Sequence, residues 1–449
     1  MPSEVLACPR CGGAVAGAEA LRCDRCALDF PRLDGIPCLT ADPGSTLGEW
    51  RNRLHFLVNG FRREIEDYDR SLNRPGLPRP TVRRMTHVRD ALDEHLRRLA
   101  ELLEPLDIGG FEASYDSQLA LKTRLPPDQG LATYYNNVHR DWCWGDEEND
   151  LSAEIVARSL RGPHDELLVL GSGASRLAYD LHQSSMARST IAADFNPMLM
   201  LLAKRIARGE TIELYEFPIA PRGIEDYAVR RALRAPEPAR EGLEFVIADA
   251  TRPPFRIGSL GAIVVPWLVD ILPDDFVQFA RRMNRLLRVD GVLIIFGSLS
   301  FHDSDMTRRY SLEECLGILE ESGFEGVAFE EARIPYMRSP ASRHARRELV
   351  IALRADKKSE ADAPSDYQAL PDWLLRDDLP VPLSPSFQSQ AVSTRIYAFI
   401  MSLIDGKRSP ADIAEVLARE GLMTLDEARP AIRGFLLKMH DDSERQTGY

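Results

Sequence analysis

Residues 167–177 read Leu-Leu-Val-Leu-Gly-Ser-Gly-Ala-Ser-Arg-Leu, an apolar run that ends in a turn with two glycines, Gly171 and Gly173. A second apolar run, 191–193, ends in the carboxylate of Asp194. A strand, a glycine turn, a helix and a second strand that ends in an acid form the pattern by which a Rossmann-like sheet holds a nucleoside cofactor. The glycines let the backbone approach the ligand, and Asp194 can accept both ribose hydroxyls.

The glycine turn by itself leaves two interpretations open. Ser175 occupies the third position of the motif, so the full dinucleotide fingerprint is absent. Glycine turns between a strand and a helix also occur for purely steric reasons. The order of the elements that follow therefore decides whether this turn marks a ligand site.

From residue 151 onward the sequence predicts strands and helices in alternation, which implies a parallel sheet with helices on both faces. The predicted elements are helix 151–160, strand 166–171, helix 175–184, strand 189–194, helix 197–208, an irregular insertion to about 240, strand 243–248, strand 262–269, helix 274–288, strand 291–297, helix 311–321, and strands 325–334 and 345–354. The last two strands are joined by a loop, which predicts an antiparallel hairpin. This ending favours the seven-stranded, Rossmann-like α/β sheet of a class I methyltransferase over a dehydrogenase. The core is expected to span 151–356.

Length, hydropathy and charge narrow the class of protein further. The 449 residues predict roughly three domains of about 150 residues each. No apolar run reaches the roughly 18 residues of a membrane-spanning helix, and the first residues lack the basic start and apolar core of a secretory signal. We therefore expect a cytoplasmic protein without a membrane segment. The net charge of -13 argues against a broad nucleic-acid-binding surface and favours small molecules or peptides as partners.

Four of the seven cysteines lie in the first 26 residues, as two Cys-x-x-Cys knuckles. These cysteines are Cys8, Cys11, Cys23 and Cys26. Two such knuckles about a dozen residues apart can present four thiolates to one tetrahedral zinc ion. Two reducible disulfides or an iron centre of the rubredoxin type are the alternatives. The remaining cysteines, Cys38, Cys143 and Cys315, are expected to be small apolar packing residues.

The zinc segment continues through 21–31 into Asp34-Gly35-Ile36-Pro37. It resembles the small zinc-ribbon protein that activates tRNA and release-factor methyltransferases, in which a similar ribbon ends in a Gly-Ile-Pro turn. The resemblance covers residues 5 to about 40 and implies that a ribbon at 1–42 stabilises a methyltransferase to which it is fused. The plainer interpretation, a zinc-stapled module too small to fold without metal, is compatible with it.

Residues 43–150 are predicted to form a helical extension or lid. Apolar residues recur at spacings near three and four over 50–68 and 81–103, with charges between them, as in amphipathic helices. A Pro-Gly-rich break at 73–80 separates the two helices. Arginines of the second helix either bind an anion or form a solvated helix face, namely Arg83, Arg84, Arg97 and Arg98.

Such sheets bind ligands at the carboxyl ends of their strands, so each strand end predicts one cofactor contact. Gly171 and Gly173 are expected to face the amino-acid part of S-adenosylmethionine, and Asp194 its ribose. Asp249 and Ala250, directly after the third strand, are expected to face the adenine. For each acid the alternative is a helix cap or a turn residue.

Five motifs, in the same order over about residues 130 to 355, resemble the carnosine N-methyltransferase family. They are Arg140-Asp141-Trp142, Gly171-x-Gly173-x-x-Arg176-Leu177-Ala178, Asp194-Phe195-Asn196, Asp270 after the fourth strand, and Gly297-Ser298-Leu299-Ser300-Phe301-His302 after the fifth. The resemblance implies that five residues of these motifs contact the cofactor, namely Arg140, Trp142, Arg176, Phe195 and Asn196. It also implies that Tyr336, in Ile334-Pro335-Tyr336, lies near the substrate.

Three positions depart from the pattern of that family. Ser298 stands in place of the usual proline, Ser175 in place of glycine, and Asp270 is followed by Ile271-Leu272 in place of Thr-Ala. We expect the second and third departures to leave cofactor binding intact and to reshape the acceptor pocket. The resemblance therefore does not identify carnosine itself as the acceptor.

The acceptor end of the predicted site carries Asp270 and His302. Methyl transfer from a sulfonium is an in-line displacement that needs an uncharged nucleophile held near the methyl carbon. A carboxylate that accepts the N–H of an imidazole fixes its tautomer and stabilises the imidazolium product, and this role falls to Asp270. His302 is expected to hold the substrate carboxylate or to relay a proton, and Tyr336 to close the pocket. A hydrogen-bonded loop histidine is the alternative for His302.

The composition changes after the core. Residues 357–388 are polar and proline-rich, as in a linker. Residues 389–449 predict helices with one Asp-Gly turn and resemble compact winged-helix modules that act as peptide chaperones, as in pyrroloquinoline quinone biosynthesis. The resemblance implies a module that binds a precursor peptide or a protein partner. A small helical docking domain is the alternative.

Together these patterns predict an S-adenosylmethionine-dependent N-methyltransferase that acts on a small imidazole-bearing amino acid, dipeptide or peptide. The zinc ion is expected to be structural. One alternative is a methyltransferase that uses the zinc ribbon on a macromolecule, tRNA or protein. The other is a non-catalytic peptide-binding scaffold with a degenerate core.

Overall fold

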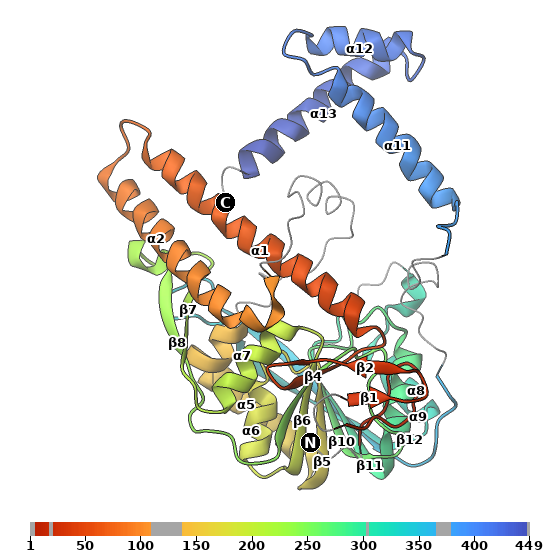
Figure 1. The fold of residues 1–449 in the computed structure, drawn as a ribbon. Coiled ribbons are helices and arrows are strands. Elements are labelled where there is room, and N and C mark those ends of the chain that lie inside the picture. Colours follow the sequence, from red (N-terminus) through yellow and green to blue (C-terminus); the bar gives the residue numbers. More distant parts are fainter. Residues whose placement is uncertain (1–4, 18–20, 109–136, 302–304, 365–378, 447–449) are drawn as a thin grey trace. The chain divides into compact units, whose positions relative to one another are not determined.

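A computed structural model describes residues 5–17, 21–108, 137–301, 305–364 and 379–446. The chain divides into two units, Met1–Tyr367 and Gln368–Tyr449. Figure 1 shows the elements of each unit, coloured along the sequence. All predicted site residues lie in the first unit.

The centre of the first unit is a nine-stranded sheet with the order β12-β13-β11-β10-β5-β6-β9-β4-β3. Seven strands belong to the predicted core: β5 (His164–Leu170), β6 (Ala187–Asp194), β9 (Leu243–Ala248), β10 (Leu260–Pro266), β11 (Leu287–Gly297), β12 (Phe324–Tyr336) and β13 (Arg346–Lys357). Neighbouring strands from β9 to β11 run parallel, whereas β13 runs antiparallel to both β11 and β12. The predicted α/β fold, including its antiparallel ending, is confirmed.

Helices cover both faces of this sheet (Figure 1). They are α5 (Asp146–Leu160), α6 (Arg176–Gln183) and α7 (Pro197–Ala207) on one face, and α8 (Phe276–Leu286) and α9 (Leu312–Glu321) on the other. Alternate residues of β5 point to opposite faces, so Leu167 and Val169 pack with the first group and Leu168 and Leu170 with the second. Burial on both faces explains why the strand is a continuous apolar run.

The N-terminal segment adds two strands to the sheet beyond the predicted seven. Its strands are β1 (Leu21–Cys23), β2 (Leu28–Phe30), β3 (Arg32–Leu33) and β4 (Ile36–Leu39). The tight turn between β3 and β4 has positive φ at Asp34 and Gly35, 46° and 74°. β4 then pairs in parallel with β9, which places Leu39 opposite Ala248. The ribbon is therefore continuous with the core sheet.

Two long helices, separated by a turn at the predicted break, form the extension. They are α1 (Pro43–Leu72) and α2 (Arg79–Leu102). The side chain of Asp42 caps α1 by accepting a hydrogen bond from the backbone N–H of Ser45. Buried residues such as Leu47, Trp50 and Leu54 lie along one face of α1. Within the described part of the chain, no helix is both long and apolar enough to cross a membrane.

The insertion before residue 240 is more ordered than predicted. β7 (Ile212–Glu216) and β8 (Val229–Leu233) form an antiparallel hairpin whose connection contains the short helix η4 (Ile224–Tyr227). The prediction of an irregular segment was wrong because the prolines lie outside the paired strands. Leu214 and Leu233 are fully buried, which gives the hairpin a core contact that its proline content obscured.

The described residues of the second unit form three helices, α11 (Pro385–Ser402), α12 (Pro410–Arg419) and α13 (Leu425–Gln446). Its small core includes Ile413, Leu417 and Ile432. The predicted Asp-Gly turn is present, since Asp405 accepts a hydrogen bond from the backbone N–H of Lys407. Residues 379–446 contain no strand. The resemblance of this unit to winged-helix modules, and the alternative of a helical docking domain, stay predictions.

Candidate functional site

The turn after β5 has the geometry of a ligand cradle. Gly171 has a φ of 74° and Gly173 a φ of 57°, both in the region that favours glycine. A Cβ on Gly171 would lie 2.7 Å from Cδ2 of Leu268, so this position has no room for a side chain. A Cβ on Gly173 would meet no heavy atom within 4 Å. Backbone therefore borders open space at this point, which fits a bound cofactor.

Asp194 lies beside the turn and is held by backbone N–H groups. Its Oδ2 accepts from the N–H of Gly173 at 2.8 Å, and its Oδ1 accepts from the N–H of Asn196 at 2.8 Å. Burial raises the pKa of Asp194 to about 6, although its backbone donors favour the charged form. The backbone N–H of Phe195 bonds the same carboxylate, and the two oxygens of an ionised carboxylate offer about four acceptor sites in all. The ionised side chain is therefore able to accept ribose hydroxyls.

Ser175, which stands where the resembling family has glycine, adopts a left-handed backbone conformation. Its φ is 65°, a left-handed value that costs a residue with a Cβ about 1–2 kcal/mol. Its hydroxyl lies 3.0 Å from that of Ser172, within hydrogen-bonding distance. Serine at this position therefore costs stability, which the contact with Ser172 partly offsets.

Trp142 and Arg176 support the glycine turn through protein contacts. Trp142 lies in η3 (Arg140–Trp144), and its indole Nε1 donates to the carbonyl of Ala174 at 2.9 Å. The guanidinium of Arg176 lies 5.6 Å from the centroid of the Trp142 ring and donates to the carbonyl of Asp141 at 2.8 Å. The structure thus brings both residues to the predicted cofactor turn and uses them to position it.

Arg140 is engaged in two buried ion pairs. Its Nε lies 2.6 Å from Oδ1 of Asp141, and its Nη1 lies 2.9 Å from Oε1 of Glu148. The other oxygen of Glu148 accepts from the backbone N–H of Met337 at 2.7 Å. Glu148 therefore links η3 to the loop after Tyr336. Sequence reasoning missed it because one of several acids in a first helical turn carries no distinguishing signal.

Phe195 and Asn196 follow Asp194 with different contacts. Asn196 caps α7, since its Oδ1 accepts from the backbone N–H of Met198 at 3.0 Å. Phe195 meets Trp50 of α1 edge to face, with 5.8 Å between the ring centroids. The indole Nε1 of Trp50 is buried, and no group in the described ranges accepts a hydrogen bond from it. Trp50 was missed because it reads as one more apolar position of an amphipathic helix.

Asp249 and Ala250 form a turn after β9. Oδ1 of Asp249 accepts from both the backbone N–H and the hydroxyl of Thr251, each at 2.8 Å. This is the turn role that the sequence left open. The adenine contact of Asp249 and Ala250 stays a prediction.

Asp270 lies in the turn after β10, because that strand ends at Pro266 and not at 269 as predicted. Its Oδ2 accepts from the hydroxyl of Ser298 at 2.7 Å and from the backbone N–H of Ser300 at 2.9 Å. Its Oδ1 has no hydrogen-bond partner in the described part of the chain. One oxygen is fixed and the other is open to a substrate donor. His302 lies outside the described residues.

An aromatic pair stands at the same edge of the sheet. The ring centroids of Trp267 and Tyr336 are 5.0 Å apart. A Cβ on Gly297 would lie 2.9 Å from Cδ2 of Trp267, so the glycine leaves room for this indole. The guanidinium of Arg346 lies 4.4 Å from the centroid of the Tyr336 ring. Trp267 was not selected from the sequence, although a tryptophan directly after a buried strand is a usable signal.

The four cysteines of the two knuckles lie together. Their sulfur atoms are all within 4.8 Å of one another, and those of Cys11 and Cys23 are 3.6 Å apart. Tetrahedral zinc with bonds of about 2.3 Å would hold its thiolates roughly 3.8 Å apart. The backbone N–H of Gly13 also donates to the Cys11 sulfur at 3.4 Å. Cys8, Cys11, Cys23 and Cys26 therefore fit a structural zinc ion.

The ribbon borders the turn at Asp249 on two sides. Ahead of this turn, β4 pairs with the end of β9. Beyond it, the N–H of Ala7 donates to the carbonyl of Pro254 at 2.9 Å, and the N–H of Arg256 donates to the carbonyl of Val5 at 2.9 Å. The cysteine cluster is thus tied to a strand end of the cofactor side.

Residues 168–295 match a family model described as a methyltransferase domain. The matched segment includes the glycine turn, Asp194, Asp249 and Asp270. Together with the order and direction of the strands, the match defines the class: the chain carries a class I S-adenosylmethionine-dependent methyltransferase domain and is an enzyme.

Several solved structures are similar to part of the chain. A methyltransferase from Methanosarcina mazei is 16% identical, with a TM-score of 0.32, and the match covers 46% of this chain and 98% of that one. The 1,6-didemethyltoxoflavin-N1-methyltransferase of Burkholderia thailandensis is 17% identical, with a TM-score of 0.32 and coverage of 56% and 92%. The complex of the Haloferax volcanii Trm112 methyltransferase activator with a methyltransferase partner is 13% identical, with a TM-score of 0.33, and the match covers 50% of this chain and 96% of that one. No curated protein matches the sequence.

Proposed function

We propose that the protein transfers the methyl group of S-adenosylmethionine to an imidazole nitrogen of a small amino acid, dipeptide or peptide. The observation that carries this proposal is the asymmetry of Asp270. One carboxylate oxygen is held by Ser298 and Ser300, and the other has no partner in the described chain. A carboxylate held in this way accepts the N–H of an imidazole and leaves the lone pair of the other ring nitrogen directed outward.

The cofactor supplies an electrophilic methyl group on a sulfonium. Gly171 and Gly173 would border its amino-acid part, and Asp194 would accept hydrogen bonds from its ribose. Arg176 and Trp142 would act on it indirectly, by holding the glycine turn. Positioning of this kind contributes most of the rate in an in-line displacement.

The acceptor side would stabilise positive charge. As the nitrogen–carbon bond forms, the carbon–sulfur bond breaks and its electron pair stays on sulfur. Asp270 faces the imidazolium that results and lowers its energy, as an Asp does in other Asp–His pairs. A π face of Trp267 or Tyr336 directed at the same charge would add to this stabilisation. His302 would hold a substrate carboxylate or relay the proton.

The ribbon and the C-terminal unit would support this reaction without taking part in it. The β4 strand of the ribbon pairs with β9 of the core sheet, and this pairing favours a stabilising role over recognition of a macromolecule. The C-terminal helices would form a docking unit for a peptide or protein partner. The alternative to these roles is that the ribbon recognises tRNA or protein as the methyl acceptor, and the experiment below distinguishes the two.

Competition between acceptor classes tests the proposal. Purified protein with deuteromethyl S-adenosylmethionine would be offered histidine, histidine-containing dipeptides, bulk tRNA and a denatured protein extract in one mixture. We expect the label on the small histidine compounds. Label confined to tRNA or protein would replace the proposal with the macromolecular alternative. Bound cofactor with no label in any fraction, and none when a cell extract is added as a further source of acceptors, would favour the non-catalytic scaffold.

A further inference from the structure

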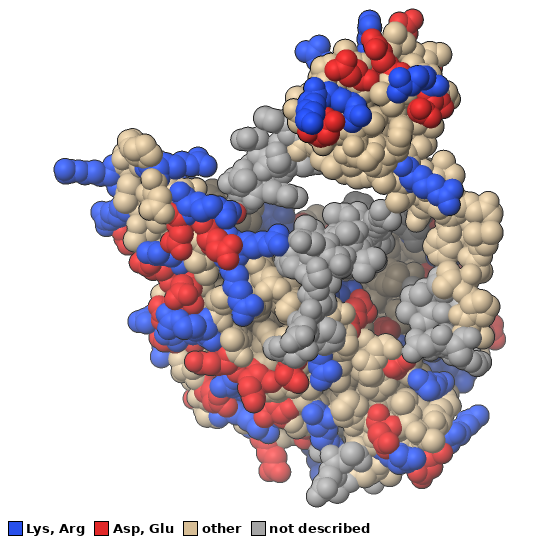
Figure 2. Space-filling view, turned by 45° about the horizontal axis from the view of Figure 1, so that its top comes forward, with Lys and Arg blue, Asp and Glu red and all other residues tan. Residues whose placement is uncertain are grey.

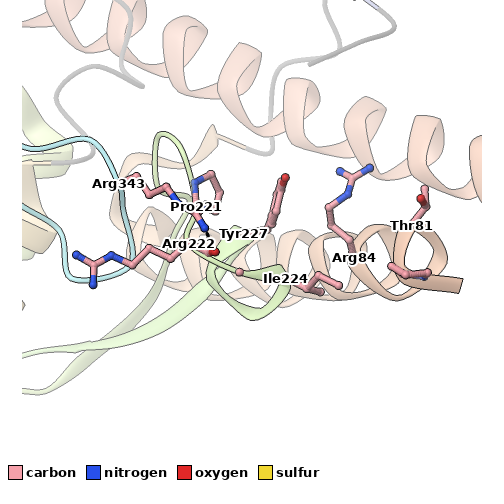
Figure 3. Close-up of a pocket in the computed structure, with 9 residues that line it drawn as sticks. Thr81, Arg84, Pro221, Arg222, Ile224, Tyr227 and Arg343 are labelled. Carbon is pink, nitrogen blue, oxygen red and sulfur yellow. Dashed lines mark hydrogen bonds between the residues drawn. The ribbon is translucent and has the colours of Figure 1, made fainter. Parts of the chain in front are cut away.

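The start of α2 carries a guanidinium that the methyl-transfer site does not use. Arg84 lines a hollow of about 300 Å³ between the first turn of α2, the segment 221–227 and the loop after β12 (Figure 3). We propose that this hollow, here called the Arg84 pocket, binds the carboxylate or phosphate group of a small molecule. The chemistry of its lining and the pairing of its arginines carry the proposal.

Arg84 is charged and lacks an acidic partner. Its guanidinium lies 5.1 Å from the centroid of the Tyr227 ring, and Figure 3 shows the two side chains extending side by side in the same direction. Among the described residues, no group forms a hydrogen bond or an ion pair with Arg84. Its neighbour Arg83, by contrast, pairs with Glu225 at 2.5 Å. Of these two neighbouring arginines, Arg84 lines the pocket and has no acidic partner, whereas Arg83 has one and does not line it.

Two further arginines make the lining positive. Arg343 donates to the backbone carbonyls of Pro221 and Arg222, and Nε of Arg222 donates to the carbonyl of Ser342 at 3.0 Å. Carbonyl acceptors fix these side chains but do not neutralise them. No carboxylate is among the lining residues. Figure 3 shows the side chain of Arg222 extending away from Arg84 and Tyr227. An anion that enters beside Tyr227 therefore meets the charge of Arg84 first, and no carboxylate of the lining opposes it.

The surrounding elements suit the same ligand. Pro78 precedes α2 without a side-chain cap, so the positive end of the helix faces this region. From α1, Tyr68 lies close enough for the charge of Arg84 to lower its pKa against the raising effects of burial and Glu64. Burial also raises the pKa of Glu64, an acid of α1 near Tyr68. Figure 2 shows basic and acidic side chains interspersed over the α1–α2 extension, so the proposal rests on this pocket and not on a broad basic face.

Guanidinium and phenol groups define the ligand class. The planar guanidinium offers paired N–H donors that match the two oxygens of a carboxylate or phosphate, and Tyr227 adds an O–H donor beside it. The loop that carries Arg343 starts directly after Tyr336. The anionic group therefore belongs either to the methyl acceptor itself or to a separate ligand.

Binding of inorganic phosphate and of acetate to the full-length protein tests the pocket without cofactor or turnover. At constant ionic strength, the unfolding temperature would be followed against anion concentration for the wild type, Arg84→Gln and Arg83→Gln. We expect a saturable rise in the wild type and in Arg83→Gln, and at least about tenfold weaker binding in Arg84→Gln, as for the loss of a charge-assisted hydrogen bond. Equal binding by Arg84→Gln, or no saturation by either anion in the wild type, would overturn the proposal.

Steady-state kinetics then identify the source of the anion. A higher KM for the acceptor in Arg84→Gln, with phosphate competing against the acceptor, would assign the pocket to the acidic group of the substrate. An unchanged KM with non-competitive phosphate would assign it to a separate ligand. Both results support an anion site, and the phosphate titration is independent of the proposed methyl transfer.

Discussion

The hydroxyl of Ser298 donates a hydrogen bond of 2.7 Å to the carboxylate of Asp270, across the ends of two neighbouring parallel strands, β10 and β11. The resembling family usually has proline at this position, which has no hydroxyl to donate. Ser298 therefore fixes the carboxylate that we propose binds the acceptor, with a side-chain bond that proline cannot make. The departure from the family pattern has a physical consequence at the site.

Replacing Ser298 with alanine tests that consequence. Loss of a hydrogen bond to a charged group costs about 1.5 kcal/mol, so kcat/KM for the acceptor is expected to fall roughly tenfold. The dissociation constant of S-adenosylhomocysteine is expected to stay the same. Ser298→Thr keeps the hydroxyl and should retain most of the activity. Equal kcat/KM for Ser298→Ala and the wild type would show that this bond does not position Asp270.

Cofactor binding is expected to weaken as the pH falls through 6. Burial raises the pKa of Asp194 to about 6, so the side chain is ionised above this pH and becomes a neutral carboxyl below it. Protonation removes acceptor capacity that the ribose hydroxyls need. Calorimetric titration of S-adenosylhomocysteine from pH 8 to pH 5 measures the effect. Asp194→Asn should bind weakly at every pH, whereas an affinity of the wild type that is flat over this range would contradict the assignment.

Removal of zinc is expected to loosen the core sheet as well as the ribbon. β4 pairs with β9, and Val5 and Ala7 bond to the segment after Asp249. A chelator or Cys26→Ser should therefore lower the unfolding temperature, speed amide exchange in β9 and weaken binding of S-adenosylhomocysteine. Cys143→Ser, a cysteine outside the cluster, is the matched control. Faster exchange limited to residues 5–30 would mean that the ribbon is an independent module.

Two buried histidines predict acid sensitivity of the first unit. His95 and His139 are both fully buried, and burial lowers their pKa values to about 4 and about 3. The unfolded chain, with histidine pKa values near 6.5, takes up these protons first as the pH falls. Stability that is fully present above about pH 6.5 is therefore lost on the way to the folded pKa values. Each histidine contributes a loss of about 1.4 kcal/mol per pH unit in that window.

Urea unfolding at pH 7, 6 and 5 measures this loss. Asp194 has a raised pKa and acts in the opposite direction below pH 6, so the comparison with His139→Asn is more informative than the slope of the wild type alone. In the variant, the slope of the unfolding free energy against pH should correspond to about one proton fewer than in the wild type. An identical slope would show that His139 is protonated in the folded protein.

Local patterns account for the parts of the fold that were predictable. β9 was predicted at 243–248 and is observed at Leu243–Ala248, because a strand buried on both faces is a short apolar run with clear ends. The cysteine cluster was predictable because the spacing of four thiols is itself the signal. The glycine turn was predictable because Gly171 has no room for a Cβ.

Contacts between distant segments account for what was missed. The pairing of β4 with β9 joins segments about two hundred residues apart, and neither strand edge carries a local signal for its partner. The contact of Trp50 with Phe195 is of the same kind. Glu148 is one acid among several in its helical turn, and only the folded chain places it between Arg140 and Met337.

Tandem mass spectrometry of the methylated product tests the central claim most directly. The acceptor compound labelled from deuteromethyl S-adenosylmethionine would be fragmented to locate the label, with the wild type and Asp270→Asn compared side by side. We predict the label on an imidazole nitrogen, and a loss of labelling in Asp270→Asn while S-adenosylhomocysteine still binds. A label on an amine, a carboxylate or a macromolecule, or full labelling by Asp270→Asn, would contradict the account.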